Sequence, residues 1–173
     1  VAMIALSSTR SLVADKSWDE ISDSRELARQ FRSLADSIPY IEDIWLNDAT
    51  GQLRATSFAF PAPKSDASDR EKFKAAQLAV DDLVVGPLIR GKVTRRPTFL
   101  LSNRMQAADG SFNGMISVTA GLAYFSDYWK GVALPYDARV TITRVPSLEV
   151  LAEFPEHGER PACLRVRPTR ALD

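Results

Sequence analysis

The sequence predicts an α+β fold, in which a long N-terminal helix packs on a mostly antiparallel sheet of five to six strands. Two observations carry this prediction. Apolar residues recur every three or four positions between Ser17 and Ile38, which is the period of an amphipathic helix. Further along, two alternating runs flank Asp109-Gly110, a dipeptide typical of hairpin turns. Helices and strands arranged in this way favour a sheet with helices on its faces.

The composition is that of an ordinary globular protein. The 173 residues are 45% hydrophobic and 25% charged, enough to bury a core as one domain or as one domain with a stalk. The 22 basic and 22 acidic residues balance, so the charge gives no support for nucleic acid or an anionic membrane surface as a partner. The apolar start at Val1–Leu6 is either the trailing edge of a membrane span or a frayed helix start.

Several catalytic chemistries lack the residues they need. With one Cys and one His, we expect no intrachain disulfide, no zinc site and no cofactor. His157 lies in a turn-like loop, and no G-x-S-x-G nucleophile elbow accompanies it, so we expect a solvated loop residue rather than a catalytic base. The phosphate-binding motifs G-x-x-x-x-G-K-[ST] and G-x-G-x-x-G are also missing from the sequence. We therefore expect a domain without enzymatic activity.

The predicted N-terminal helix has clear signals at both ends. Ser17 with Glu20 forms a capping-box pattern at its start, and Pro39 ends it because the residue before a proline is pushed out of the helical region. Nothing before Ser17 is a strong helix breaker, so the helix could extend back towards Val1. Its apolar stripe either packs on the protein's own sheet or forms a dimerising stalk.

The rest of the chain alternates between strands and short helices. Strands are expected over 41–46 and 52–57, joined by a turn, and a helix over 70–82 is expected after a proline-containing loop. A short strand at 84–89 is interrupted by Gly86-Pro87, which favours an edge position. The remaining predicted elements are the central hairpin, an aromatic-rich helical turn and a final hairpin, at 98–106 with 112–120, 122–129, and 138–144 with 148–154.

Four short stretches form a joint pattern, namely Ser68-Asp69-Arg70-x-x-Phe73, Ser102-x-Arg104, Asp109-Gly110-x-Phe112-x-Gly114 and Tyr124-Phe125. Together they resemble the Cache (extracellular PAS-like) sensor domains, most closely the first module of the double-Cache sensors of bacterial histidine kinases and diguanylate cyclases. The resemblance covers roughly Ser17 to Pro155. The sequence departs from the family at Lys72, where an aromatic residue often stands, and the 18 residues after Pro155 imply a single module.

The resemblance implies both an organisation and a function. It implies a stalk or packing helix at 1–38, a PAS-like Cache sensor module at 39–157, and a tail or linker at 158–173. It further implies an extracytoplasmic, periplasmic domain of a bacterial inner-membrane signalling protein of the histidine kinase or diguanylate cyclase type. Such a domain binds a small organic solute, an organic acid or amino-acid-like molecule, and signals through the N-terminal helix. Membrane spans would lie outside this sequence.

Two alternatives accompany this function. The N-terminal helix could hold a homodimer, and the module could be ligand-free, acting only in dimerisation or structural coupling. Asp69 is either a helix cap or a ligand contact. The aromatic residues of the pattern are either pocket lining or core.

Candidate ligand-binding residues come from the central hairpin and from the pattern before it. Side chains alternate along 98–106, so one face of the hairpin mixes polar and apolar groups, as pocket linings do. Arg104 can hold a carboxylate through two parallel N–H donors; the alternative is a solvated Arg or one paired with Asp69. The expected ligand-binding set is Arg104, Ser102, Tyr124, Phe73, Arg70, Asp69, Trp45 and Lys72, with no metal ligand.

Overall fold

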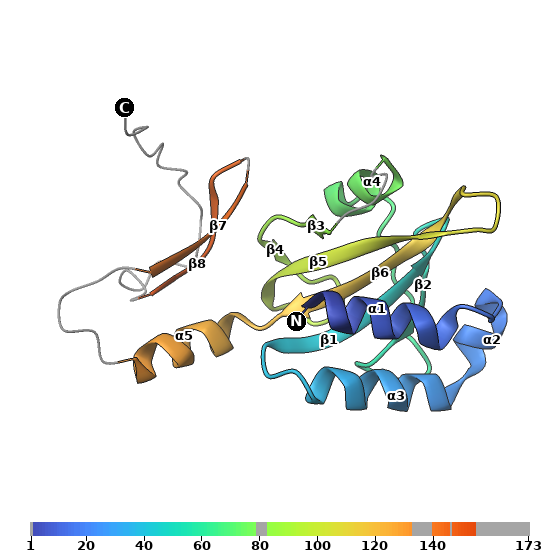
Figure 1. Cartoon of the computed structure of the whole chain (residues 1–173), viewed down its shortest axis with the longest axis horizontal. Helices are drawn as coiled ribbons and strands as arrows, with labels where there is room; N and C mark the ends of the chain where they lie inside the picture. The colour runs from blue at the N-terminus through green and yellow to red at the C-terminus, as the bar shows by residue number, and fades with distance from the viewer. Residues whose placement is uncertain (1, 79–82, 133–139, 146, 155–173) are drawn as a thin grey trace. The chain divides into compact units, whose positions relative to one another are not determined.

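The computed structural model describes residues 2–78, 83–132, 140–145 and 147–154 (Figure 1). The chain divides into two compact units, residues 1–121 and 122–173. Four sequence predictions fall at least partly outside the described residues: the end of the 70–82 helix, the start of the 138–144 strand, the loop histidine His157, and the tail at 158–173.

The first unit begins with three helices. They are α1 (Ala2–Val13), α2 (Trp18–Asp23) and α3 (Arg25–Asp36). The predicted capping box is confirmed, because the Ser17 hydroxyl accepts a hydrogen bond from Glu20 N at 3.3 Å while the Glu20 carboxylate accepts one from Ser17 N at 2.7 Å. Ser17 therefore marks the start of α2, as the sequence predicted.

The N-terminal helix differs from the prediction at two places. Residues 14–17 separate α1 from α2, so the helix does not run back unbroken from Ser17 towards Val1. The expected helix over Ser17–Ile38 is interrupted at Ser24, whose backbone is extended at φ −88° and ψ 98°. The Ser24 hydroxyl accepts a hydrogen bond from Leu27 N at 3.1 Å and so caps α3. Serine offers the backbone an alternative to helical hydrogen bonds and is preferred at N-caps, which explains the break between α2 and α3.

A six-stranded antiparallel sheet follows, with the order β2-β1-β6-β5-β3 and with β4 also paired to β5. β5 and β6 form the predicted central hairpin, and Gly110 takes the positive φ of +81° that its turn requires. The predicted α+β fold is confirmed. The strands are β1 (Ile41–Asp48), β2 (Leu53–Thr56), β3 (Val84–Val85), β4 (Ile89–Arg90), β5 (Pro97–Gln106) and β6 (Phe112–Ala120).

The two faces of the sheet are covered by different helices. Ile116 belongs to a large buried cluster that includes residues of α1, α2 and α3. Its neighbour Met115 packs instead with Phe73 and Ala76 of α4 (Glu71–Leu78). Because successive residues of a strand point to opposite faces, α4 covers the face opposite the N-terminal helices. Figure 1 shows α4 and α3 on opposite sides of the strands.

The second unit contains one described helix and one hairpin. They are α5 (Leu122–Gly131) and the antiparallel pair β7 (Val140–Arg144) and β8 (Glu149–Phe154), which confirm the aromatic helical segment and the final hairpin. α5 contacts β8. Within the part of the chain that the structure describes, no helix is long and apolar enough to cross a membrane.

Candidate functional site

A cavity of about 70 Å³ lies on the α4 face of the sheet. Its sheet side is formed by residues of β1, β2, β4, β5 and β6, and its other walls by the 65–67 loop, the start of α4 and the 91–94 turn. At about 15 Å³ for each water-sized group, this volume holds roughly five such groups, which suits a small organic molecule. The sheet residues that line it are Trp45, Asn47, Leu53, Ile89, Thr98, Leu100 and Thr119.

The sheet side of the cavity is held in place by hydrogen bonds. Trp45 Nε1 donates to Thr119 Oγ1 at 2.7 Å, across from β1 to β6, and the Trp45 ring stacks on Phe58 at 6.0 Å between centroids. Asn47 Nδ2 donates to the carbonyl oxygen of Gly51 at 2.9 Å. Because the indole N–H already has a partner, the Trp45 ring is fixed as an apolar wall of the cavity.

Lys72 is the unusual residue of the cavity wall. The side chain extends from the first turn of α4, and the residue is only 8% exposed. Burial, with a smaller contribution from the positive charge of Arg70, lowers the pKa of Lys72 from 10.5 to about 7. No hydrogen bond or ion pair links its ammonium group to another described residue. The site therefore contains a buried cation with no protein anion beside it.

The other charged groups at the cavity differ in whether a hydrogen bond or an ion pair engages them. Lys92 Nζ donates to Asp69 Oδ1 and to the Asp66 carbonyl oxygen, both at 2.6 Å, so Lys92 is neutralised. Ser68 N donates to Asp66 Oδ1 at 2.7 Å, and this bond lowers the pKa of Asp66. Arg70 lines the cavity and makes no hydrogen bond or ion pair with the described residues. Arg70 and Lys72 thus leave the wall electropositive.

Three of the eight sequence-predicted site residues line this cavity, namely Trp45, Arg70 and Lys72. Asp69 lies at its margin, through the ion pair with Lys92. Phe73 is 2% exposed and packs edge-on against Phe112 at 5.4 Å, in the cluster beneath α4.

The remaining predicted residues lie elsewhere. Ser102 is buried, with its hydroxyl 2.8 Å from that of Ser117. Arg104 lies nearer the hairpin turn, where its Nη2 donates to Gly110 O at 3.3 Å and its guanidinium is 5.8 Å from the centre of the Phe112 ring. Neither residue lines the cavity. Tyr124 lies on α5 in the second unit and stacks on Tyr128 at 6.2 Å.

Some lining residues were not singled out from the sequence. Thr119 lies next to the lining residue Leu100 in the β5–β6 register, so a residue-by-residue pairing of the predicted hairpin could have found it. Lys92 follows Gly91 in a turn, where no periodic pattern indicates which way a side chain points. Asn47 follows the strand predicted over 41–46 and is expected in its turn, whereas the structure places it within β1.

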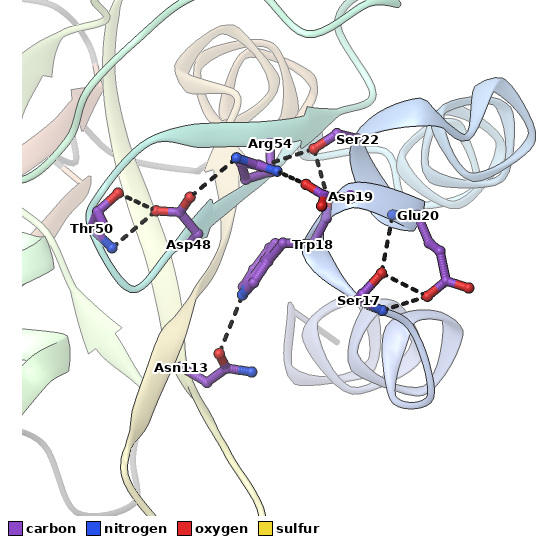
Figure 2. Close-up of polar contacts among 9 residues, drawn as sticks. All are labelled: Ser17, Trp18, Asp19, Glu20, Ser22, Asp48, Thr50, Arg54 and Asn113. Carbon is purple, nitrogen blue, oxygen red and sulfur yellow. Dashed lines mark hydrogen bonds and ion pairs between the residues drawn. The ribbon is translucent and has the colours of Figure 1, made fainter.

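A polar network connects the turn after β1 to α2 (Figure 2). Asp48 Oδ1 accepts hydrogen bonds from Thr50, and Asp48 Oδ2 lies 3.7 Å from Arg54 Nη1. Arg54 in turn donates to Ser22 Oγ at 2.9 Å and to Asp19 Oδ1 at 2.7 Å. Arg54 therefore fastens α2 to the β1–β2 hairpin.

The same hairpin contacts the loop that lines the cavity. Ala67 N donates to the carbonyl oxygen of Gly51 at 2.9 Å, and Leu53 N donates to the carbonyl oxygen of Ser65 at 2.9 Å. Gly51 has a φ of +94°, and a Cβ there would lie 2.7 Å from Ser68 N, so the turn requires glycine. Continuous contacts thus run from the cavity wall through the turn and Arg54 to α2.

Solved structures of sensory domains share this fold. The extracellular domain of rpHK1S-Z16, assigned as a histidine kinase, aligns with a TM-score of 0.64 and 25% identity, over 86% of this chain and 68% of that one. The sensory domain of the Campylobacter jejuni chemoreceptor Tlp3, with isoleucine bound, aligns with a TM-score of 0.62 and 11% identity, over 87% of this chain. This chain spans 60% of the length of the Tlp3 domain.

A third structure is the ligand-binding domain of the Pseudomonas aeruginosa amino acid chemoreceptor PctC in complex with GABA. It aligns with a TM-score of 0.62 and 19% identity, over 91% of this chain and 68% of that one. No protein-family model matches this chain, and no curated protein matches its sequence.

Proposed function

Because the fold is that of the Cache sensor domains, as the sequence resemblance predicted, we propose that this chain is a ligand-binding sensor domain of a membrane-bound signalling protein. The domain would lie outside the cytoplasm and pass a binding signal to an output domain of the histidine kinase or diguanylate cyclase type. It would act by binding rather than by catalysis.

The observation that carries the proposal is the electropositive cavity under α4. Arg70 lines it and makes no hydrogen bond or ion pair with the described residues, and its planar guanidinium can hold a carboxylate through two parallel hydrogen bonds. Trp45 and Leu100 supply apolar walls, while Thr98 and Asn47 supply polar groups. A mostly apolar cavity with a few convergent polar groups is the usual form of a small-molecule site. The ligand would be a small organic anion.

The known ligands of the structural neighbours agree with the carboxylate part of this chemistry, although each also carries an ammonium group. The Tlp3 domain was solved with isoleucine and the PctC domain with GABA, and each of these molecules has one carboxylate. In the proposed complex the ligand carboxylate meets Arg70, and its remaining atoms lie against Trp45.

The polar network of Figure 2 supports a route for the signal through the N-terminal helices. A ligand that contacts Ala67 or Asp66 presses on the loop bonded to the Gly51 turn. Asp48 and Arg54 connect that turn to α2, so a shift of the loop would change the pose of α2 relative to the sheet. A ligand can bias the helices only if it binds one pose better than the other.

The test is a binding screen with a matched pair of arginine variants. The purified domain is heated with organic acids, amino acids, amines and purines, and hits are measured by calorimetry. A ligand at about one hundred times its Kd stabilises a domain by about 2.7 kcal/mol, which raises the melting temperature by several degrees. We expect an organic anion to bind, Arg70→Gln to abolish binding, and Arg104→Gln to leave it intact.

The arginine pair also separates the competing possibilities. If Arg104→Gln loses binding and Arg70→Gln does not, the ligand binds at the hairpin-turn end of β5 and not in the cavity. If no compound binds and the domain is a dimer in solution, the ligand-free dimerisation module is the better account. Unchanged melting temperatures of both ligand-free variants would show that folding is intact.

A further inference from the structure

Lys72 is buried without compensation, although its surroundings contain several charged groups. Four charged residues line the cavity: Asp66 from the loop, Arg70 before α4, Lys92 from the 91–94 turn, and Lys72 itself. β1, β5 and β6 face the cavity with uncharged side chains only, among them Trp45, Asn47, Thr98, Leu100 and Thr119. The protein therefore offers Lys72 no anion from the sheet side.

The two carboxylates nearby are already engaged. Asp69 accepts a hydrogen bond from Lys92, and Asp66 accepts one from Ser68 N. Arg70 is a second cation beside Lys72, and its charge further lowers the pKa of Lys72. A buried charge normally has a partner, because removing it from water is costly. We therefore expect the ligand to supply the anionic group that pairs with Lys72.

Arg70 alone suffices for a ligand with one carboxylate, so Lys72 has a separate part in recognition. The two cations are two residues apart at the start of α4 and line the same cavity of about 70 Å³. The hydroxyl of Thr119 also lines this cavity. Because its oxygen accepts the hydrogen bond of Trp45 Nε1, and its own O–H makes no hydrogen bond with the described residues, that O–H can donate to an anionic group.

We propose that Lys72 is a second cationic anchor beside Arg70, so that the cavity selects a small solute with two anionic groups, such as a short dicarboxylate, over a solute with one. This inference rests on the proposed function, which needs only one anionic group. It also couples binding to pH. The ammonium form of Lys72 is the form that holds an anion, and raising the pH above about 7 depletes it in the ligand-free domain.

The experiment compares diacids with probes of nearly the same shape and one charge fewer. Malonate, succinate and glutarate are each titrated against their monoamides by calorimetry, with wild type, Lys72→Met and Lys72→Arg. We expect the best diacid to bind wild type about tenfold or more tighter than its monoamide, since hydrogen bonds between charged groups are the stronger ones. Lys72→Met should lose this preference, while Lys72→Arg should keep it.

A pH series adds a second test, because the preference for the diacid would not change with pH in this way if Lys72 had only a structural role. Between about pH 7 and pH 9, the preference of wild type for the diacid should fall as Lys72 loses its proton, whereas that of Lys72→Arg should stay constant. Asp66 remains ionised over this range because the Ser68 hydrogen bond lowers its pKa.

The outcomes distinguish this inference from the function on which it rests. Equal affinities for diacid and monoamide, with both lost in Arg70→Gln, would refute the second anchor and leave the sensor function standing. A preference that survives in Lys72→Met would also refute it. If no anion binds the wild-type domain at all, both the inference and the proposed function fail.

Discussion

Replacing Lys72 by methionine should stabilise the ligand-free domain at neutral pH. Methionine keeps the length and apolar character of the lysine stem and removes the buried charge. Each unit of pKa corresponds to about 1.4 kcal/mol, so the fall of the Lys72 pKa from 10.5 to about 7 sets an upper limit of about 5 kcal/mol on the gain. This upper limit refers to the increase in the free energy of unfolding that Lys72→Met should produce.

The direction in which the stability gain of Lys72→Met changes with pH follows from proton binding. Between about pH 7 and pH 10.5 the unfolded chain holds the Lys72 proton and the folded chain does not. The stability contribution of Lys72 therefore rises with pH across this window, and the advantage of Lys72→Met shrinks towards pH 10.5. Below about pH 7 the advantage is complete.

Urea unfolding across this pH range measures the effect, with Lys74→Met as the control. Lys74 is an exposed lysine on the same helix, and its replacement should change the free energy of unfolding by less than about 0.5 kcal/mol. A Lys72→Met variant that is no more stable than wild type at pH 7, or whose advantage does not change with pH, would refute the account of Lys72 as an uncompensated buried cation.

Two further predictions concern the frame around the site. Gly114→Ala should lower the free energy of unfolding by roughly 3 kcal/mol or more, because a Cβ at its φ of +131° would lie 2.7 Å from Trp18 and against the Asn47 carbonyl oxygen. Gly110→Ala should cost only about 1 kcal/mol, since its surroundings are open; equal losses in chemical denaturation would contradict this. In wild type we expect a bound ligand to slow amide exchange in α2, whereas Arg54→Met should cost about 1 kcal/mol, leave ligand affinity unchanged and remove this slowing. Undiminished protection of α2 in that variant would rule out the route through Arg54.

Local sequence signals predicted much of the fold. The capping box of Ser17 and Glu20 and the turn at Gly110 act through near neighbours, so they can be recognised without tertiary structure. The break at Ser24 was missed because the apolar period continues through it, from Ile21 to Leu27, and serine is only a weak helix breaker.

The site was less predictable, for a geometric reason. Strand alternation correctly places Thr98 and Arg104 on one face of β5, but six residues along a strand separate them by roughly 20 Å. Alternation thus identifies the face of a sheet and not the position of a cavity on it. That position depends on where α4, the 65–67 loop and the 91–94 turn meet the sheet, and these are long-range contacts.

The central claim, that a small organic anion binds between α4 and the sheet, is tested most directly by the indole N–H resonances in a ¹H–¹⁵N spectrum. Trp45 lines the cavity, whereas Trp18 packs with the N-terminal helices on the opposite face. We expect a binding anion to shift the Trp45 signal, assigned through Trp45→Phe, by direct contact, and to move the signal of Trp18 less, through the response of α2 alone. Saturating ligand that leaves the Trp45 resonance unmoved would contradict the account.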